Sequence, residues 1–434
     1  MQVEAWLARS ARRFGDRVAI ETPERSLSYG ELEEMAGAGA AELGVAPGAR
    51  VAIALPPGLA FVVALHSCLR AGAVAVPIDP RDPASDLRGA QADVVIDGPL
   101  DCRAATAPAR EHELEDAALI VRTSGTSGEP KDVPLTYGNF LWSAIGSAVA
   151  LGLDPRERWL CTLPLVHVGG LSIVLRSAIY GTTAVLHERF DAQAAARAIT
   201  EDEITLVSVV ATTLRRLLDA GLSNPLALRC ALAGGGPVPP GLIERARLAG
   251  VTVAQTYGLT EACSQVATQS PGEREPAAGP PLFCSRVAIA SEGEILVSGP
   301  TVSPSVSGGA LATGDVGELL PVGSLRVFGR ISETIISGGE NVSPSEVEAV
   351  LEEHPLVAEA GVYGVVDEEW GEAVHAAVVA RAPLPGGELR AWCATRLAAY
   401  KVPKEIRLVE VLPRTPSGKL QRKLLVVDDG SASP

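Results

Sequence analysis

The sequence has few aromatic residues, no closely spaced cysteines and no excess of positive charge. Aromatic side chains make up 4% of the 434 residues, and the seven cysteines form no Cys-x-x-Cys pair. An odd number of scattered cysteines argues against a disulfide framework or a thiolate metal cluster, and it fits a reducing compartment. The formal net charge of −15 argues against nucleic acid or an acidic membrane as a partner, because binding such polyanions needs a basic surface.

A long hydrophobic run is also missing. Charged residues interrupt the apolar positions of residues 3–14, so this segment predicts an amphipathic helix rather than a signal peptide or a membrane span. The longest apolar region, residues 51–78, is broken by Pro56 and Pro57 and contains Arg70. We therefore expect a cytoplasmic protein without integral membrane association.

The sequence does contain a regular alternation of strand and helix patterns. Residues 51–79 indicate strand, turn, helix and strand, a βαβ unit typical of parallel sheets with a right-handed crossover. Further apolar segments alternate with helical patterns at 159–164, 183–186, 206–210, 230–233 and 251–255. Together they predict an α/β fold of doubly wound layers, which bind ligands at the carboxyl ends of their strands.

The pattern changes twice in the last third of the chain. From Gly279 onward, short β segments separated by glycine and proline predict a small β subdomain. A compact α+β unit is expected after Arg330, and one of its helices would begin with Ser343 as N-cap and Pro344 at the first helical position. Glu346 would complete a capping box with Ser343.

The stretch 121–139, VRTSGTSGEPKDVPLTYGN, directly follows an apolar strand pattern at 117–121. Its hydroxyl, glycine and basic residues are Thr123, Ser124, Gly125, Thr126, Ser127, Gly128 and Lys131. Glycines let backbone N–H groups face an anion, hydroxyls add donors and a lysine adds charge, so we predict a phosphate-binding loop. Such composition usually indicates a flexible linker, but a linker is not expected directly after an apolar strand or to end in Pro-Lys.

Downstream motifs add candidate ligands for a nucleotide. Gly234, Gly235 and Gly236 follow a strand and would let a flat ring lie against bare backbone. The segment 255–261, QTYGLTE, is expected to form a strand-to-helix turn. It offers the ring of Tyr257 beside Gly258, the hydroxyl of Thr260, and in Glu261 a hard oxygen ligand suited to Mg²⁺. Each motif alone is more often an ordinary turn or a surface carboxylate.

Three more motifs complete the series. Asp315, in a predicted loop Thr-Gly-Asp, could accept both hydroxyls of a ribose, because an ionised carboxylate only accepts hydrogen bonds. Arg330 precedes the sequence ISGGEN, which contains Gly338 and Gly339. Lys419 lies in the segment PRTPSGKL near the C-terminus, which by itself would be a solvated basic turn.

The order SGTSGEPK, YGLTE, TGD, GR…SGGEN and PSGK resembles that of the adenylate-forming superfamily, which includes acyl- and aryl-CoA synthetases, and it spans almost the whole chain. The resemblance implies an N-terminal domain, residues 1–331, that binds ATP and a carboxylic acid. It also implies a mobile C-terminal domain, residues 332–434, which rotates about a hinge just after Arg330. Ser332 stands where relatives often have Asp or Lys.

The resemblance also implies residue roles. The loop 123–131 would hold the β- and γ-phosphates of ATP, Gly234 to Gly236 and Tyr257 the adenine, Thr260 a phosphate oxygen, Glu261 the Mg²⁺, and Asp315 with Arg330 the ribose. Lys419 would reach the α-phosphate and the carboxylate during adenylation. After rotation, Gly338 and Gly339 would lie beside a tunnel for the pantetheine of coenzyme A, gated by His167. Lys419, His167 and Glu261 are thus the predicted catalytic residues.

The segment 164–191 resembles the o-succinylbenzoate:CoA ligases of menaquinone biosynthesis, which implies an aromatic dicarboxylate as substrate. Arg176 or Arg189 could bind the carboxylate that does not react, although a surface salt bridge is the alternative for Arg176. Two alternative functions are a benzoate-type or short-chain CoA ligase and a non-catalytic nucleotide-binding protein. The sequence also leaves open whether the protein forms a homo-oligomer. Asp132 stands where relatives commonly have Gly and is expected to weaken ATP binding.

Overall fold

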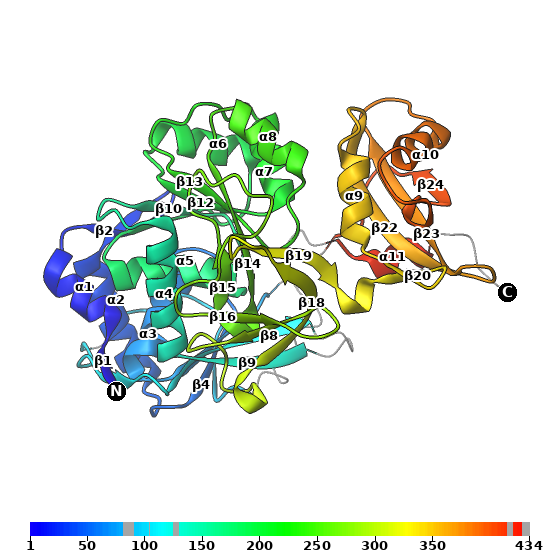
Figure 1. Ribbon diagram of the computed structural model, residues 1–434. Coiled ribbons are helices and arrows are strands. Elements are labelled where there is room, and N and C mark those ends of the chain that lie inside the picture. Colours follow the sequence, from blue (N-terminus) through cyan, green and yellow to red (C-terminus); the bar gives the residue numbers. More distant parts are fainter. Residues whose placement is uncertain (81–90, 104, 125–129, 415–419, 428–434) are drawn as a thin grey trace.

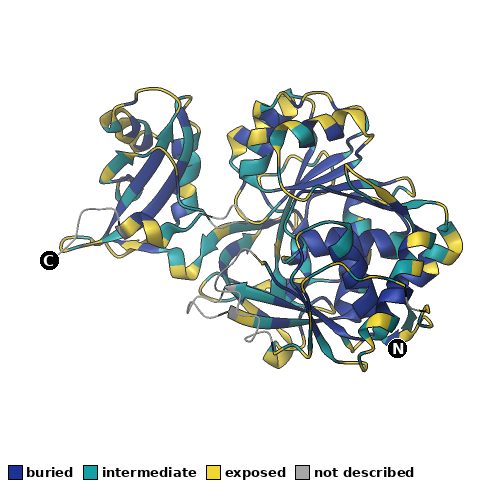
Figure 2. Cartoon of the chain, turned by 180° about the vertical axis from the view of Figure 1, so that it is seen from behind, coloured by how far each residue is buried: buried dark blue, intermediate teal, exposed yellow. Residues whose placement is uncertain are grey.

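The computed structural model describes residues 1–80, 91–103, 105–124, 130–414 and 420–427. The chain forms a large body, residues 1–330, and a small body, residues 335–427, joined by the short 3₁₀ helix η3 (Ile331–Glu333) (Figure 1). Figure 2 shows that buried residues concentrate in the interior of each body, while exposed residues lie on the outer helices and loops. No helix in the described ranges is both long and apolar enough to cross a membrane.

The first sheet of the large body has five strands in the order β6-β4-β5-β8-β9. Their bounds are β4 (Arg50–Ile53), β5 (Val74–Pro77), β6 (Val94–Ile96), β8 (Ala117–Ser124) and β9 (Pro130–Thr136). All pairings are parallel except that of β8 with β9, which are antiparallel neighbours. The helix α3 (Leu59–Ala71) joins β4 to β5, which confirms the predicted βαβ unit.

The second sheet has eight strands in the order β15-β14-β13-β12-β10-β11-β2-β3. Their bounds are β2 (Val18–Glu21), β3 (Ser26–Ser28), β10 (Arg158–Cys161), β11 (Thr183–Leu186), β12 (Leu206–Val209), β13 (Cys230–Ala233), β14 (Val253–Leu259) and β15 (Ser264–Thr268). The strands from β14 to β2 run parallel, and only the two edge strands are antiparallel to their neighbours. The strand β2 comes from the start of the chain and pairs with β11, Ile20 opposite Ala184.

Helices cover both faces of the second sheet. One face packs in a core shared with the first sheet, which contains α1 (Trp6–Phe14), α2 (Tyr29–Leu43), α3, α4 (Tyr137–Leu151) and α5 (Val168–Tyr180). The other face is covered by α6 (Ala192–Glu201), α7 (Ala211–Asp219) and α8 (Pro240–Leu248). Strands buried on both faces are apolar throughout, which explains the continuous hydrophobic patterns in the sequence. The short strands β1 (Gln2–Glu4) and β7 (Glu111–Glu113) pair at the N-terminus.

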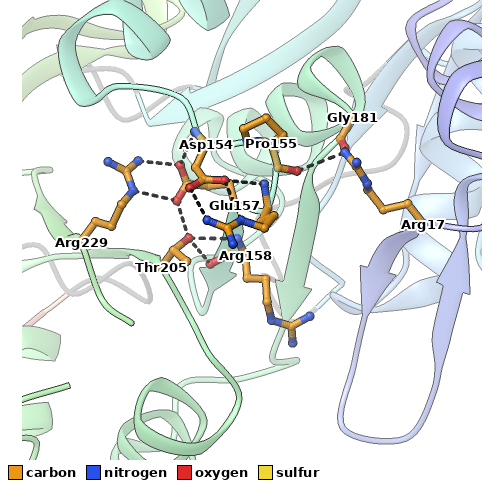
Figure 3. Close-up of polar contacts among 9 residues, drawn as sticks. Arg17, Asp154, Pro155, Glu157, Arg158, Gly181, Thr205 and Arg229 are labelled. Atoms are coloured by element: carbon orange, nitrogen blue, oxygen red, sulfur yellow. Dashed lines mark hydrogen bonds and ion pairs between the residues drawn. The ribbon is translucent and has the colours of Figure 1, made fainter. Parts of the chain in front are cut away.

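A buried carboxylate fixes the amino ends of several strands of the second sheet (Figure 3). Glu157 is 2% exposed and accepts hydrogen bonds from Arg229, 2.6 Å to Nη2 and 3.2 Å to Nε, and one from the Thr205 hydroxyl. Thr205 in turn accepts a 2.9 Å hydrogen bond from the backbone N–H of Arg158. Burying a charge is costly unless it is paired, so this network holds the end of the sheet opposite to the strands' carboxyl ends.

The β subdomain and the small body follow as predicted. The strands β16 (Arg286–Ile289), β17 (Glu294–Ser298), β18 (Leu311–Leu319) and β19 (Leu325–Arg330) form an antiparallel sheet, near the 3₁₀ turn η2 (Ser307–Gly309). The small body contains β20 (Ile335–Ser337), β21 (Glu340–Val342), β22 (Val357–Asp367), β23 (Gly371–Ala380), β24 (Glu405–Leu408), α9 (Pro344–Glu352), α10 (Gly386–Ala394), α11 (Arg422–Val427) and the 3₁₀ turn η4 (Ala399–Lys401). The predicted fold class is confirmed.

The predicted capping box at α9 is wrong. Pro344 does occupy the first helical position, but the Ser343 hydroxyl does not cap the helix and donates instead to the backbone oxygen of Phe328. Glu346 forms a 2.7 Å ion pair with Lys401 rather than reaching back to the cap. The competing partners lie far away in sequence, so tertiary contacts override the local signal.

Candidate active site

Tyr257, Asp315 and Arg330 meet where the eight-stranded sheet touches the β subdomain. The Tyr257 hydroxyl donates a 2.7 Å hydrogen bond to Oδ2 of Asp315, and Nε of Arg330 lies 3.1 Å from Oδ1. Asp315 is buried, and it pairs directly with Arg330 in the ladder of β18 and β19. Burial and the Asp315 carboxylate raise the pKa of Tyr257, so the phenol stays protonated as a donor.

The structure corrects the expected surroundings of Asp315. The segment Thr-Gly-Asp lies inside strand β18 and not in a loop. The Thr313 hydroxyl donates to the backbone oxygen of Ile295 at 2.8 Å and accepts the backbone N–H of Asp315 at 3.1 Å. The ladder register shifts next to Asp315, between Val316 and Gly317, and this irregularity explains why a turn-like tripeptide occurs within a strand.

The glycine-rich turn after β13 exposes bare backbone at the carboxyl edge of the sheet. A Cβ on Gly234 would lie 2.7 Å from Cγ2 of Thr256, so this turn packs tightly against β14. Gly235 has a φ of +77°, and both Gly235 and Gly236 are exposed. Open α/β sheets bind ligands at this edge, which is where the prediction placed a flat ring.

The segment containing Glu261 continues as a strand hairpin and not as the predicted helix. The strand β14 ends at Leu259, the 3₁₀ turn η1 (Thr260–Ala262) follows, and β15 returns antiparallel. A Cβ on Gly258 would lie 1.7 Å from the backbone oxygen of Ser264, so only glycine allows the two strands to approach so closely. Thr260 and Glu261 are partly exposed beside this turn.

Ser303 joins the Glu261 turn to β9, the strand that follows the predicted phosphate loop, and sequence reasoning missed it. Its backbone N–H donates to the backbone oxygen of Glu261 at 2.8 Å, and its hydroxyl donates to the backbone oxygen of Pro134 in β9 at 2.7 Å. Asn139, at the start of α4, adds hydrogen bonds to the backbone oxygens of Pro300 and Val302. No local pattern marks Ser303, because its partners are distant in sequence.

The phosphate-loop prediction falls partly outside the described residues. Gly125, Thr126, Ser127 and Gly128 belong to the segment 125–129, which the structure does not describe, and Thr123 and Lys131 are paired on the two strands flanking it, β8 and β9. Lys131 is exposed. Asp132, expected to weaken ATP binding, lies 3.2 Å from Nε of Arg122 and 3.9 Å from Nη1 of Arg50. These two cations offset its negative charge next to the loop.

Glu261 is the candidate metal ligand. Among the residues the structure describes, no group of three or more His, Cys, Asp or Glu side chains is arranged to hold a metal ion. Mg²⁺ often binds through one or two carboxylates together with substrate phosphates and water. Glu261, a single partly exposed carboxylate, therefore fits Mg²⁺, and the described residues around it do not provide the ligand set of a zinc site.

His167 and Arg176 are carried by the same helix, α5. His167 occupies the N-cap position and is exposed, although the protein around it lowers the pKa of the imidazole, an effect that Asp79 opposes. Its neutral form therefore predominates at pH 7. Arg189, the other candidate for the acid carboxylate, is exposed in the segment after β11.

Arg176 is a buried cation, which excludes the surface salt bridge. It is 3% exposed, its Nη2 donates to the Ser143 hydroxyl at 2.9 Å, and it lies 5.8 Å from the ring centre of Trp159. Ser143 in turn donates to the backbone oxygen of Cys263, two residues after Glu261. No carboxylate within the described part of the chain forms an ion pair with Arg176, and its Nε has no hydrogen-bond partner there.

The candidate residues of the small body lie apart from this cluster. Gly338 and Gly339, with φ values of +61° and +83°, form the turn between β20 and β21, and the Gly338 N–H donates to Trp370. Lys419 lies outside the described residues. The ends of its segment are described, and Arg414 and Leu420 pair there in an antiparallel bridge.

Two family models match the chain. The model for AMP-binding enzymes matches residues 7–97 and 90–306, and the model for the C-terminal domain of AMP-binding enzymes matches residues 346–419. The chain belongs to the AMP-binding enzyme family. This confirms the resemblance to adenylate-forming enzymes.

This AMP-binding enzyme is 40% identical over 471 aligned positions to the 2-succinylbenzoate–CoA ligase of Bacillus licheniformis, with 97% of this chain and 98% of that one covered. Its structure matches the o-succinylbenzoate CoA synthetase of Bacillus subtilis in complex with the acyl-adenylate intermediate, with a TM-score of 0.89, 36% identity and 98% of both chains covered. A double mutant of that enzyme bound to a product analogue matches with a TM-score of 0.71, 36% identity and 99% of both chains covered. The overall structure of this chain is thus more similar to the acyl-adenylate complex than to the double mutant with the product analogue.

Proposed function

We infer that this AMP-binding enzyme is an ATP-dependent ligase for o-succinylbenzoate. In the first half-reaction the succinyl carboxylate attacks the α-phosphorus of ATP, which forms an acyl-adenylate and releases pyrophosphate. In the second, the thiol of coenzyme A attacks the acyl carbon, which forms the thioester and releases AMP. The product belongs to menaquinone biosynthesis. The principal support is the junction of Tyr257, Asp315 and Arg330, together with relatives named for this reaction over nearly the whole chain.

Asp315 is suited to bind the ribose. Each carboxylate oxygen has one protein donor, Tyr257 on Oδ2 and Arg330 on Oδ1, and each oxygen keeps a free lone pair. Two ribose hydroxyls could use these acceptors, while the face of Tyr257 and the turn of Gly234 to Gly236 would hold the adenine. The phenol and the guanidinium hold the carboxylate in one orientation.

Neutralisation of negative charge would lower the activation barrier of the first half-reaction. A carboxylate that attacks a triphosphate brings anions together, so the enzyme needs cations where charge peaks in the transition state. Glu261 would hold Mg²⁺, which supplies positive charge at the phosphates, and Thr123, Lys131 and Lys419 would add donors. Removal of one preorganised donor of this kind typically slows a reaction by roughly 10²- to 10³-fold.

Arg176 would supply the charge for the second carboxylate of the acid. A buried guanidinium is costly when, as here, no carboxylate of the described residues pairs with it, and an anionic substrate would remove that cost. Its link through Ser143 to Cys263 places it beneath the turn that carries Glu261. Because Arg176 is nearly inaccessible, the substrate would reach it through a bridging water or after side-chain movement.

The two half-reactions need different groups at one site, so we propose that the small body moves. The domains would be residues 1–331 and 332–434, with the hinge after Arg330. Lys419 would serve the first half-reaction, and Gly338 and Gly339 would approach the coenzyme A thiol and His167 in the second. Domain movement lets one site exchange its groups between steps.

We place the reaction in the cytoplasm, since all seven cysteines are free.

The test is substrate-dependent turnover by the full chain. ATP–pyrophosphate exchange and coenzyme A-dependent release of AMP should both occur with o-succinylbenzoate, and Lys419→Ala should lose the exchange. Benzoate, a short-chain acid and a fatty acid serve as competitors. Turnover of one of these acids with none of o-succinylbenzoate would favour the alternative ligases, and absence of exchange with every acid would favour a non-catalytic nucleotide-binding protein.

A further inference from the structure

Arg215 forms ion pairs across the boundary between the two bodies. It lies on α7 of the large body, which faces α9 of the small body (Figure 1). Its Nη2 lies 3.1 Å from Oε2 of Glu352 at the end of α9, and its Nη1 lies 3.6 Å from Oε1 of Glu359 in β22. The Arg215 and Glu352 side chains are only 13% and 11% exposed, so this contact is largely shielded from water.

The same network extends to the segment that carries Lys419. The other oxygen of Glu359, Oε2, accepts a 2.7 Å hydrogen bond from Nη2 of Arg414. Arg414 pairs with Leu420, so the two residues close the base of the segment 415–419. Glu359 therefore contacts both the large body and the base of the predicted catalytic loop.

The two carboxylates depend on Arg215 only while the bodies are in contact. Burial raises the pKa of Glu352, and the neighbouring Glu359 raises it further, whereas Arg215 lowers it. If the small body turned away, Glu359 would keep Arg414, and Glu352 would keep the 3.2 Å hydrogen bond from the Ala360 N–H and gain water. The two bodies can therefore separate without leaving a buried charge unpaired. If Arg215 were removed while the bodies stay in contact, however, Glu352 would be a buried charge without its cation, which is destabilising.

We propose that Arg215 is a positioning residue for adenylation, which rests on the proposed function. Through Glu352 and Glu359 it holds the small body in the arrangement seen here, which is the one more similar to the acyl-adenylate complex. Release of these ion pairs accompanies the turn to thioester formation. Arg215 acts through the placement of the small body and touches no substrate.

The experiment measures the two half-reactions separately in Arg215→Ala, Arg215→Lys and Glu352→Gln. The rate constant of ATP–pyrophosphate exchange should fall by about 5- to 50-fold in Arg215→Ala, as for a typical coupling between sites, with the KM values within about twofold. Thioester formation from added acyl-adenylate should not become slower. Arg215→Lys should recover part of the exchange, because it keeps the charge.

Arg216→Ala is the matched control, because Arg216 lies on the same helix and its guanidinium is 4.9 Å from the ring centre of Phe190 within the large body. It should leave the ratio of the two half-reaction rates unchanged. The double variant Arg215→Ala with Glu352→Gln should be no slower in exchange than Arg215→Ala, since both changes remove one contact. Equal loss in both half-reactions, or no loss of exchange, overturns the proposal.

A readout without substrate separates this proposal from the proposed function. Small-angle X-ray scattering of the unliganded Arg215→Ala and Glu352→Gln variants should give a larger radius of gyration than that of wild type, and Arg216→Ala should match wild type. Identical scattering from all variants overturns the role of Arg215. If wild type shows no exchange with o-succinylbenzoate, the substrate assignment fails, and the half-reactions are then compared with whichever acid supports exchange.

Discussion

The hydrogen bond between Tyr257 and Asp315 joins two sheets that share no strand. Tyr257 belongs to the eight-stranded sheet and Asp315 to the antiparallel sheet of the β subdomain, and 2.7 Å separates the phenol oxygen from Oδ2. This contact brings an aromatic face and a carboxylate to one place. Both are needed to hold a nucleoside, so the geometry of this pair leads to the first prediction.

Asp315→Ala should lower kcat/KM for ATP by about 10- to 100-fold, the usual effect of losing hydrogen bonds to a charged group. The loss should appear mainly as a higher KM for ATP, while the KM for the acid changes little. Tyr257→Phe keeps the ring and leaves Arg330 beside Asp315, so its effect should be smaller. Steady-state kinetics with ATP and acid varied separately would decide, and a change confined to the acid would contradict the ribose assignment.

Arg176→Met should affect binding of the acid without harming the fold. Replacement of a buried charge by an apolar side chain of similar length is often neutral or stabilising, so the unfolding temperature should stay the same or rise. The kcat/KM for o-succinylbenzoate should fall by at least about tenfold, as when one partner of a charge pair is lost. The matched substrate is 3-benzoylpropionate, which lacks the ring carboxylate. Its turnover should be unchanged, and an equal loss for both acids would contradict the role of Arg176.

Acid should destabilise the large body between about pH 6.5 and pH 4. Burial lowers the pKa of both His66 and His112 from 6.5 to about 4. In this range the unfolded chain binds these protons and the folded chain does not, so the free energy of unfolding falls as pH falls. His66 and His112 line one cavity. Glu33 and Arg70 also line it, and they form an ion pair with each other.

The check is thermal unfolding at a series of pH values for wild type and His66→Leu, which has a similar volume. The variant should lose less stability than wild type between pH 6.5 and pH 4, because one fewer group titrates there. Its unfolding temperature at pH 8 serves as the reference for any packing effect. Parallel pH profiles for the two proteins would show that His66 does not contribute.

Arg229→Met should destabilise the large body by about 3 to 5 kcal/mol, because it leaves the buried Glu157 carboxylate without its cation. Adding Glu157→Gln should restore much of this loss. Arg245→Ala is the control, because its pair with Asp219 is exposed, 41% and 49%, and such pairs contribute about 0 to 1 kcal/mol. Chemical denaturation that shows the same loss for Arg229→Met and for the control would contradict this account.

Local patterns were sufficient for the fold class and for most elements. The βαβ unit at 51–79 and the change to β segments after Gly279 are both confirmed. Hydrophobic periodicity is a local signal, and buried parallel strands make it strong. The resemblance of the motif series to the adenylate-forming superfamily, and not periodicity, assigned Tyr257, Asp315 and Arg330 to one candidate site.

Contacts between distant segments were not predictable in this way. Ser343 was expected to cap α9 but instead bonds to Phe328, and Asp315 was expected in a loop but lies in β18. Ser303 and Arg215 each join elements far apart in the chain, and nothing in their neighbouring residues indicates it. A side chain whose partners are set by tertiary structure leaves no local pattern in the sequence.

The insertion of β2 beside β11 has a consequence for biosynthesis. Val18–Glu21 leaves the ribosome early, yet its parallel neighbour Thr183–Leu186 is translated more than a hundred residues later. Until β11 is translated, β2 can pair with β3 but the edge that later binds β11 has no partner, and such exposed edges are prone to aggregate. Nascent chains halted before Thr183 should thus depend on chaperones more than chains long enough to expose residues 183–186 outside the ribosome.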